Sequence, residues 1–143
     1  MANNKIPSLG FHHIAIQVKD FDTEKKFFTE GLGLKPYAEW KSGKNGEKTI
    51  CLLELGNGGF IELFSCGTDE PIANSRFLHF AMQVADVEAA YNCAIAAGAA
   101  SVKVPAVGPV ASVPVKLTLQ CAFVRAPGGY ELEFFRILDA VEA

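Results

Sequence analysis

The sequence predicts an α+β domain made of two tandem βαβββ modules, and an internal repeat is the main reason. Residues 11–20 read FHHIAIQVKD and residues 77–86 read FLHFAMQVAD, with six identities in ten positions. His13 recurs as His79, 66 residues later. Each copy opens the same order of sequence patterns, which is a strand, a helix and three further strands. We therefore expect the 143 residues to form one domain with two similar halves.

The first module is expected over residues 10–64. Its first strand, Phe11–Val18, alternates in polarity, and Asp20 stands where a helix N-cap belongs. The helix that follows ends near Gly31 or Gly33. The turn sequences SGKNGE and GNGG favour hairpins between the later strands. These strands are expected over Lys35–Trp40, Lys48–Leu55 and Phe60–Phe64.

Residues 65–76 are expected to connect the halves, and the second module is expected over residues 77–137. Asp86 is the second predicted N-cap, and Gly98 ends a helix with a regular apolar face. That face comprises Val87, Ala90, Tyr91, Ala94 and Ile95. The later strands are expected over Ala100–Val104, Val115–Arg125 and Tyr130–Arg136.

Two segments of the second half are expected to be irregular. Residues 105–114 contain Pro105, Pro109 and Pro114, so we expect an apolar loop that either packs on the core edge or acts as a lid. The tail after Leu138 is expected to be frayed.

The composition excludes several classes of function. Half of the residues are hydrophobic, one fifth are charged, and the formal net charge is −3. The chain contains no run of Lys or Arg that would favour binding to nucleic acid or to an anionic membrane. No apolar stretch reaches the ~18 residues of a membrane span, and residues 1–7 lack an apolar signal core. We expect a cytoplasmic protein.

The four cysteines are widely spaced and are expected to be reduced, because nothing in the chain signals secretion. Cys51, Cys93 and Cys121 lie in apolar runs and are expected in the core, and the fourth cysteine is Cys66.

The repeated strand carries the candidate chemistry. Side chains alternate between the two faces of a strand, so His13, Ala15 and Gln17 share one face. The other face is mostly apolar and should be covered by a helix. His12 occupies the position of Leu78 in the second copy, which assigns His12 to the packing face and leaves His13 as the candidate.

Each module also ends with a glutamate in an apolar strand, Glu62 in the first and Glu133 in the second. A buried carboxylate there must be neutralised, paired or bound to a metal. One His and one Glu from each half, related by the repeat, favour an N₂O₂ metal site. The alternative is that both histidines are satisfied core residues and both glutamates face solvent.

These motifs resemble the vicinal oxygen chelate superfamily, which includes glyoxalase I, methylmalonyl-CoA epimerase, extradiol dioxygenases and fosfomycin-resistance proteins. The resemblance rests on HIAIQVKD and HFAMQVAD, on FFTEGLGL, and on the IEL and LEF strands. It implies that the modules form a cupped, incomplete barrel around a divalent metal held by His13, Glu62, His79 and Glu133. It also implies a homodimer, in which modules pair either within one chain or between chains.

Glu62 resembles the glutamate that bacterial glyoxalase I carries at the second ligand position. The epimerases usually carry glutamine at that position. The resemblance therefore implies a glyoxalase I-like lyase or isomerase that converts a 2-oxoaldehyde–thiol hemithioacetal through a metal-stabilised enediolate. Glu133 is the first candidate for the proton-transferring base and Glu62 the second. Nitrogen and oxygen ligands suit a divalent Ni, Co, Zn, Mn or Fe ion, and the sequence does not choose among them. The alternatives are an acyl-CoA epimerase and a metal-free protein that binds a small molecule such as an antibiotic.

Two positions depart from the glutathione-using glyoxalases. These enzymes usually carry an arginine four residues after the first ligand, where this chain has Gln17, and often an asparagine four residues after the second, where it has Cys66. A neutral amide does not replace a guanidinium that grips a carboxylate. The metal chemistry is thus expected to be retained, whereas the contact that grips a glutathione carboxylate is missing and the identity of the thiol stays open.

Overall fold

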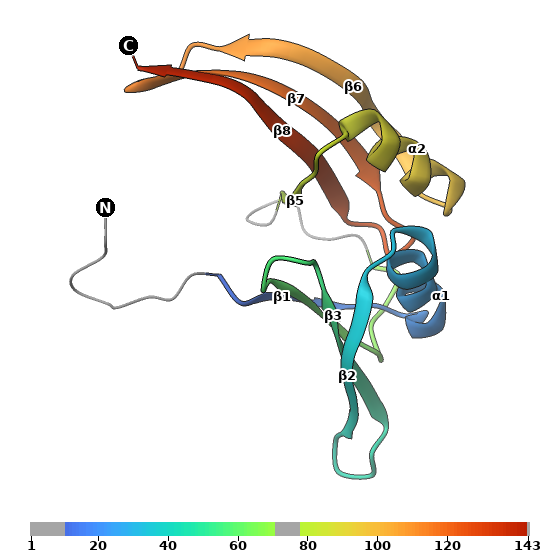
Figure 1. Ribbon diagram of the computed structural model, residues 1–143. Coiled ribbons are helices and arrows are strands. Elements are labelled where there is room, and N and C mark those ends of the chain that lie inside the picture. Colours follow the sequence, from blue (N-terminus) through green and yellow to red (C-terminus); the bar gives the residue numbers. More distant parts are fainter. Residues whose placement is uncertain (1–10, 71–77, 143) are drawn as a thin grey trace, which may run out of the picture.

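The computed structural model describes residues 11–70 and 78–142 and contains two mixed four-stranded sheets (Figure 1). The first half comprises β1 (His13–Gln17), α1 (Phe21–Lys26), the π-helical turn η1 (Phe27–Gly31), β2 (Lys35–Ser42), β3 (Lys48–Glu54) and β4 (Phe60–Phe64). The second comprises β5 (His79–Gln83), α2 (Val87–Ala96), β6 (Ala100–Val110), β7 (Val115–Arg125) and β8 (Glu131–Glu142). The two βαβββ modules predicted from the repeat are confirmed.

Both sheets have the same topology. Their strand orders are β1-β4-β3-β2 and β5-β8-β7-β6. In each sheet the first strand pairs in parallel with the last strand of its half, and the other pairings are antiparallel. A parallel pair needs a crossover connection, which the helix and the intervening strands provide here. β1 and β5 therefore lie at equivalent sheet edges, next to the strands that carry Glu62 and Glu133.

Both predicted helix N-caps are confirmed. The Asp20 side chain accepts a hydrogen bond from the backbone N–H of Thr23 at 3.1 Å. The Asp86 side chain accepts one from the N–H of Ala89 at 3.0 Å. Each bond satisfies a backbone donor that the first helical turn leaves free, which fixes where the helix begins after the repeated strand.

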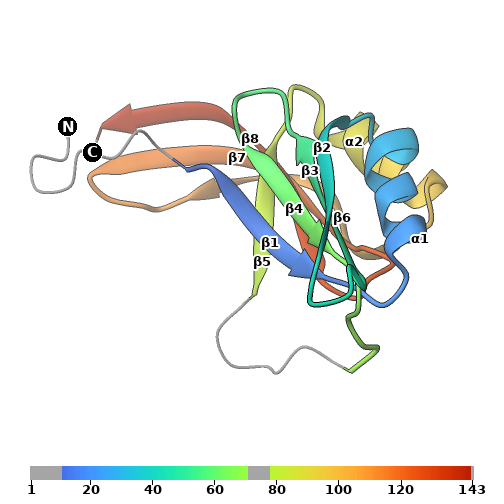
Figure 2. The same cartoon turned by 90° about the horizontal axis from the view of Figure 1, so that it is seen from below.

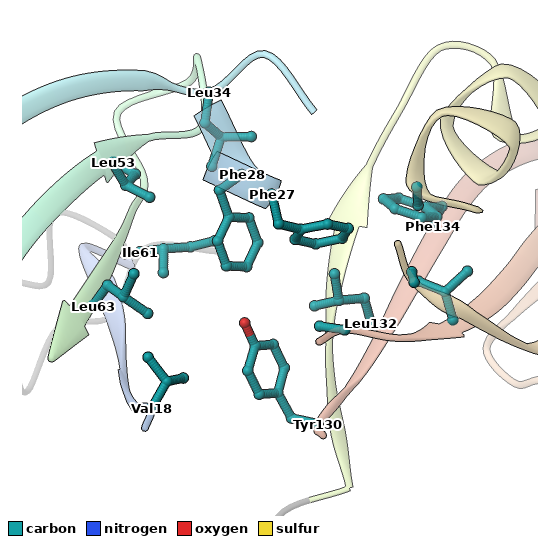
Figure 3. Packing of buried hydrophobic residues seen from close by; sticks show 14 of the residues in the cluster. Val18, Phe27, Phe28, Leu34, Leu53, Ile61, Leu63, Tyr130, Leu132 and Phe134 are labelled. Carbon is teal, nitrogen blue, oxygen red and sulfur yellow. The ribbon is translucent and has the colours of Figure 1, made fainter. Parts of the chain in front are cut away.

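A single apolar core joins the two modules (Figure 3). Phe28, Leu53 and Ile61 enter it from the first module, and Leu132 and Phe134 enter it from the second. The helices lie on the same side of the molecule (Figure 1). They approach closely, because a Cβ placed at Gly31 would lie 2.5 Å from the Cβ of Ala97. Each module thus completes the burial of the other.

Residues 105–110 correct one expectation, because they continue strand β6 to Val110 rather than forming a loop. β6 is an edge strand, and proline is tolerated at a sheet edge where its missing N–H removes no ladder bond. The pairing with β7 shifts register between Lys103 and Ala106, on either side of Pro105. Residues 105–110 are therefore part of a sheet and do not form a lid.

The C-terminal tail is the second correction. β8 continues past Leu138 to Glu142. It pairs along its whole length with β7, from Arg125–Glu131 to Val115–Glu142, with one shift of register. β5 pairs only with the first part of β8, up to Phe135. The far ends of β7 and β8 consequently form an arm that projects beyond the module (Figure 2).

All four cysteines are free, as expected, but their burial differs from the prediction. Cys51 is buried, whereas Cys93 is exposed on α2 and Cys121 is half-buried. Among residues 11–70 and 78–142, no helix has the length and apolar character needed to cross a membrane.

Candidate metal centre

His13 and Glu62 form a close pair at the edge of the first sheet. β1 and β4 run in parallel, with Ala15 opposite Glu62, so His13 lies one same-face position before the glutamate. The His13 Nε2 atom lies 3.6 Å from Glu62 Oε1. The side chains are 39% and 17% exposed, so the pair faces solvent at its imidazole and is mostly covered at its carboxylate.

The second sheet contains the equivalent pair. Ala81 lies opposite Glu133 in the parallel ladder of β5 and β8, and His79 Nε2 lies 3.4 Å from Glu133 Oε1. The exposed fractions of the two side chains, 32% and 19%, are also similar. The sequence repeat is therefore reproduced as a repeat of side-chain geometry.

The spacing within each pair fits a bound divalent cation. Two donors on one ion, each ~2.0–2.2 Å from it, lie roughly 2.8–3.1 Å apart in octahedral geometry and roughly 3.3–3.6 Å apart in tetrahedral geometry. The observed 3.6 Å and 3.4 Å lie in the tetrahedral range and a few tenths of an ångström above the octahedral one. Imidazole nitrogen with carboxylate oxygen is also a donor set that suits borderline divalent metals.

The two pairs do not meet within one chain. In the described part of the chain, no three His, Cys, Asp or Glu side chains come together closely enough to hold one ion. The pairs lie in separate sheets, each between an edge strand, β1 or β5, and its inner neighbour, β4 or β8. Each chain therefore presents two separate His–Glu pairs, here called half-sites, and the metal site with four ligands stays a prediction.

The environments of the two imidazoles differ. The Nδ1 atom of His13 lies 2.8 Å from the Nδ1 atom of His12, and the rings meet edge to face. The His79 ring instead meets Phe123 edge to face, with centroids 5.1 Å apart. The assignment of His12 to the packing face is wrong, because His12 is exposed and contacts its neighbour. β1 begins only at His13, so the strict alternation of faces does not extend to His12.

A profile of the glyoxalase/bleomycin resistance protein/dioxygenase superfamily matches residues 10–134. The chain belongs to this superfamily. It is 30% identical over 128 residues to a probable lactoylglutathione lyase of Vibrio parahaemolyticus, covering 87% of this chain and 88% of that protein. The superfamily name spans enzymes and resistance proteins, so membership alone does not specify a reaction.

Solved structures of the superfamily have the same fold. Maize glyoxalase I superposes with a TM-score of 0.69 at 26% identity, covering 90% of this chain but only 45% of the maize chain. A glyoxalase family protein from Bacillus cereus superposes with a TM-score of 0.69 at 18% identity, covering 96% and 100% of the two chains. The agreement across such different sequences confirms the glyoxalase fold.

Gln17 and Cys66, the two departures from the glutathione-using members of the superfamily, lie together. The Gln17 amide donates hydrogen bonds to the backbone carbonyls of Ser65 at 3.1 Å and Cys66 at 3.4 Å. Cys66 has a φ of 65°, in the left-handed region that few non-glycine residues adopt. A cavity of about 320 Å³ lies beside them and is also lined by Ala15, Thr68 and Glu70. The Gln17 side chain therefore holds a strained loop at the cavity wall.

A buried charge that the sequence pattern did not indicate joins the two modules. Glu24 on α1 is 2% exposed, and its Oε1 accepts hydrogen bonds from the Tyr130 hydroxyl at 2.6 Å and the Gly128 N–H at 3.0 Å. Burial raises the pKa of the Glu24 carboxyl, and these two hydrogen bonds oppose that shift. Glu24 lies within the polar run DTEKK, so only the folded arrangement shows its contact with the second module.

Proposed function

We propose that this chain is a metal-dependent, glyoxalase I-like lyase or isomerase that acts on the hemithioacetal of a 2-oxoaldehyde and a thiol. The observation that carries the proposal is the repeated His–Glu pair, His13 with Glu62 and His79 with Glu133, at 3.6 Å and 3.4 Å. The similarity to a probable lactoylglutathione lyase supports the same reaction class. A pure binding protein has no need of two such pairs.

The four side chains would hold a divalent ion such as Ni, Co, Zn, Mn or Fe. When bound, the ion supplies a Lewis acid that stabilises negative charge developing beside a substrate carbonyl. The protein supplies the proton transfer. Glu133 is 19% exposed, so its carboxylate is partly shielded from water yet reachable from the sheet face, which suits a general base and then a general acid.

We propose that the complete site forms between two copies of the chain, the first pair of one copy facing the second pair of the other. The separation of the pairs within a chain supports this arrangement. So do the sheet edges at β1 and β5, which are each hydrogen-bonded on one side only among the described strands. Exposed apolar residues on the projecting arm, Ile137, Leu138 and Val141, are further candidates for burial in a dimer.

The thiol of the substrate is proposed not to be glutathione. Gln17 is neutral and its amide is already engaged by the 65–66 loop, so it is not a carboxylate receptor. Glu70, a carboxylate, lines the adjoining cavity and would repel an anionic group. A thiol with neutral or cationic substituents fits these surroundings better.

The proposal is tested by assaying metal-loaded protein on methylglyoxal hemithioacetals formed with several thiols, and on acyl-CoA epimer pairs in parallel. We expect metal-dependent isomerisation of at least one hemithioacetal. Turnover of acyl-CoA epimers alone would replace the proposal by the epimerase alternative. Absence of both activities, with no metal taken up on titration, would favour a small-molecule binding protein.

A further inference from the structure

The imidazole rings of the sequence neighbours His12 and His13 contact each other through their Nδ1 atoms. Their Nδ1 atoms lie 2.8 Å apart and the ring planes make an angle of 85°. A hydrogen bond between two ring nitrogens contains one proton, so one ring donates and the other accepts. The opposite nitrogen of His13, Nε2, faces the Glu62 carboxylate at 3.6 Å.

This arrangement determines which nitrogen of His13 can bind a cation. A neutral imidazole carries its proton on one nitrogen and offers a lone pair on the other. If the His13 proton lies on Nδ1 and is donated to His12 Nδ1, the lone pair lies on Nε2, beside Glu62. A hydrogen bond at the far nitrogen of a ligand histidine commonly fixes both its tautomer and its ring orientation.

His12 is itself held by the strand that carries Glu62. Its backbone carbonyl accepts a hydrogen bond from the Phe60 N–H at 2.8 Å. Its ring lies against the Phe60 ring with centroids 5.0 Å apart, and Phe60 in turn contacts Tyr37. Phe60 lies two residues before Glu62 on β4, so His12 is positioned by the same strand as the carboxylate.

We propose that His12 is a positioning residue for the first half-site, holding His13 with Nε2 directed at Glu62 and with its proton on Nδ1. The second half-site uses another device, because the equivalent residue is Leu78 and the His79 ring packs against Phe123. The histidines of the two half-sites are thus held by different contacts, although their geometry toward the glutamates is similar. This inference rests on the proposed metal site.

Three variants test the role of His12 in the full chain. His12→Leu introduces the residue that the second half carries at this position and removes the acceptor. His12→Asn keeps a short side-chain acceptor close to the position of Nδ1. Leu78→Ala is the matched control, since Leu78 is 70% exposed and precedes a histidine that is oriented by an aromatic ring instead. Zinc affinity and stoichiometry are measured by titration against a competing chelator.

We expect His12→Leu to bind zinc about 10–100-fold more weakly with unchanged stoichiometry, the usual cost of losing such a hydrogen-bond partner. His12→Asn should recover most of the affinity and Leu78→Ala should match the wild type. An unchanged affinity in His12→Leu would overturn the inference while leaving the proposed function intact. A lower stoichiometry would also overturn it, because His12 would then be a ligand. A wild type that takes up no zinc would contradict the proposed function instead.

The hydrogen bond can also be tested without metal. Proton–nitrogen correlation spectra of ¹⁵N-histidine protein at mildly alkaline pH report which ring nitrogen is protonated. We expect one hydrogen-bonded proton between the Nδ1 atoms of His12 and His13 in the wild type, seen as a downfield ring N–H signal that His12→Leu loses. The same His13 ring signals in both proteins would contradict the positioning role, whatever the outcome of the zinc titration.

Discussion

Glu24 is a carboxylate that is buried between two modules rather than at the candidate metal centre. Its contacts with Tyr130 and Gly128 tie α1 to the turn that leads into β8, the strand of Glu133. A Cβ at Gly128 would lie 3.0 Å from Glu24 Oε1 and from a methyl of Val18, so the glycine allows this close approach. The carboxyl group thus links the first module to the turn that precedes β8.

Replacing Glu24 tests this connection. Glu24→Ala leaves the Tyr130 hydroxyl and the Gly128 N–H without their acceptor, and we expect a loss of about 1–3 kcal/mol in the free energy of unfolding. Glu24→Gln keeps an acceptor oxygen and should lose less. Denaturant unfolding of the three proteins measures both changes, and equal losses in the two variants would contradict the assigned hydrogen bonds.

The pH dependence of the same variants has a defined sign. Burial raises the pKa of Glu24 in the folded state, so the group contributes stability that is fully present below its unfolded pKa and is lost as pH rises through the folded value. The free energy of unfolding of the wild type, relative to Glu24→Gln, should therefore fall as the pH rises above the ordinary pKa of a glutamate. A difference that rises with pH would show that the hydrogen bonds outweigh burial.

Glu133 is the residue to which the proposed reaction assigns proton transfer. Glu133→Gln keeps the size of the side chain but removes the base, and we expect turnover on the preferred hemithioacetal to fall about 10²–10⁴-fold. Glu62→Gln, the equivalent change in the first half-site, should have the smaller effect. Metal content is measured in both variants. Full turnover by metal-loaded Glu133→Gln would exclude this role.

The helices depend on a close approach at one glycine. Gly31 ends η1 against Ala97, the C-cap of α2, where there is no room for another methyl group. We expect Gly31→Ala to destabilise the fold by about 1–3 kcal/mol because overpacking displaces one helix. Gly108→Ala is the control, since a Cβ there meets open space.

A double substitution separates overpacking from a backbone effect. Gly31→Ala alone places two methyl groups at a contact that has room for one. Adding Ala97→Gly leaves one methyl group there, as in the wild type, and should recover much of the lost stability. The measurement is the midpoint of thermal unfolding. No recovery in the double variant would indicate that Gly31 is needed for its backbone conformation rather than for space.

The elements that the sequence predicted correctly are those with local or repeated signals. The N-caps Asp20 and Asp86, the hairpin turns and the first strands are specified by residues close in the chain. The extent of β6 was missed because the effect of Pro105 depends on its position at a sheet edge, which the strand order decides. The extension of β8 to Glu142 was missed because its partner is the long β7 rather than anything in the tail itself.

The candidate site shows the same division. The repeat selected the pairs His13–Glu62 and His79–Glu133, since parallel pairing of the first and last strands brings them together in each sheet. The roles of His12 and Glu24 could not be inferred from the sequence. The role of His12 depends on side-chain geometry at the start of a strand, and that of Glu24 depends on a contact between modules that are distant in sequence.

At the scale of the whole molecule, the proposed complete site requires a symmetric assembly of two chains. In a two-fold dimer, each patch of one subunit meets the complementary patch of the other, so two half-sites per chain make two complete sites per dimer. In the proposed dimer, a chain whose two pairs are separated, one on β1 and β4 and one on β5 and β8, would still contribute to a site with four ligands. Either pair alone leaves the ion with two protein ligands.

The most direct test of this account is a mixing experiment with two chains that are each disabled in one half-site. His13→Ala and His79→Ala should be inactive alone. After unfolding and refolding together, they should recover about a quarter of wild-type metal-dependent activity, because about half of the dimers are mixed and each has one intact site. Recovery at that level supports a site shared between chains. Inactive mixed dimers, with active wild-type protein, would contradict it.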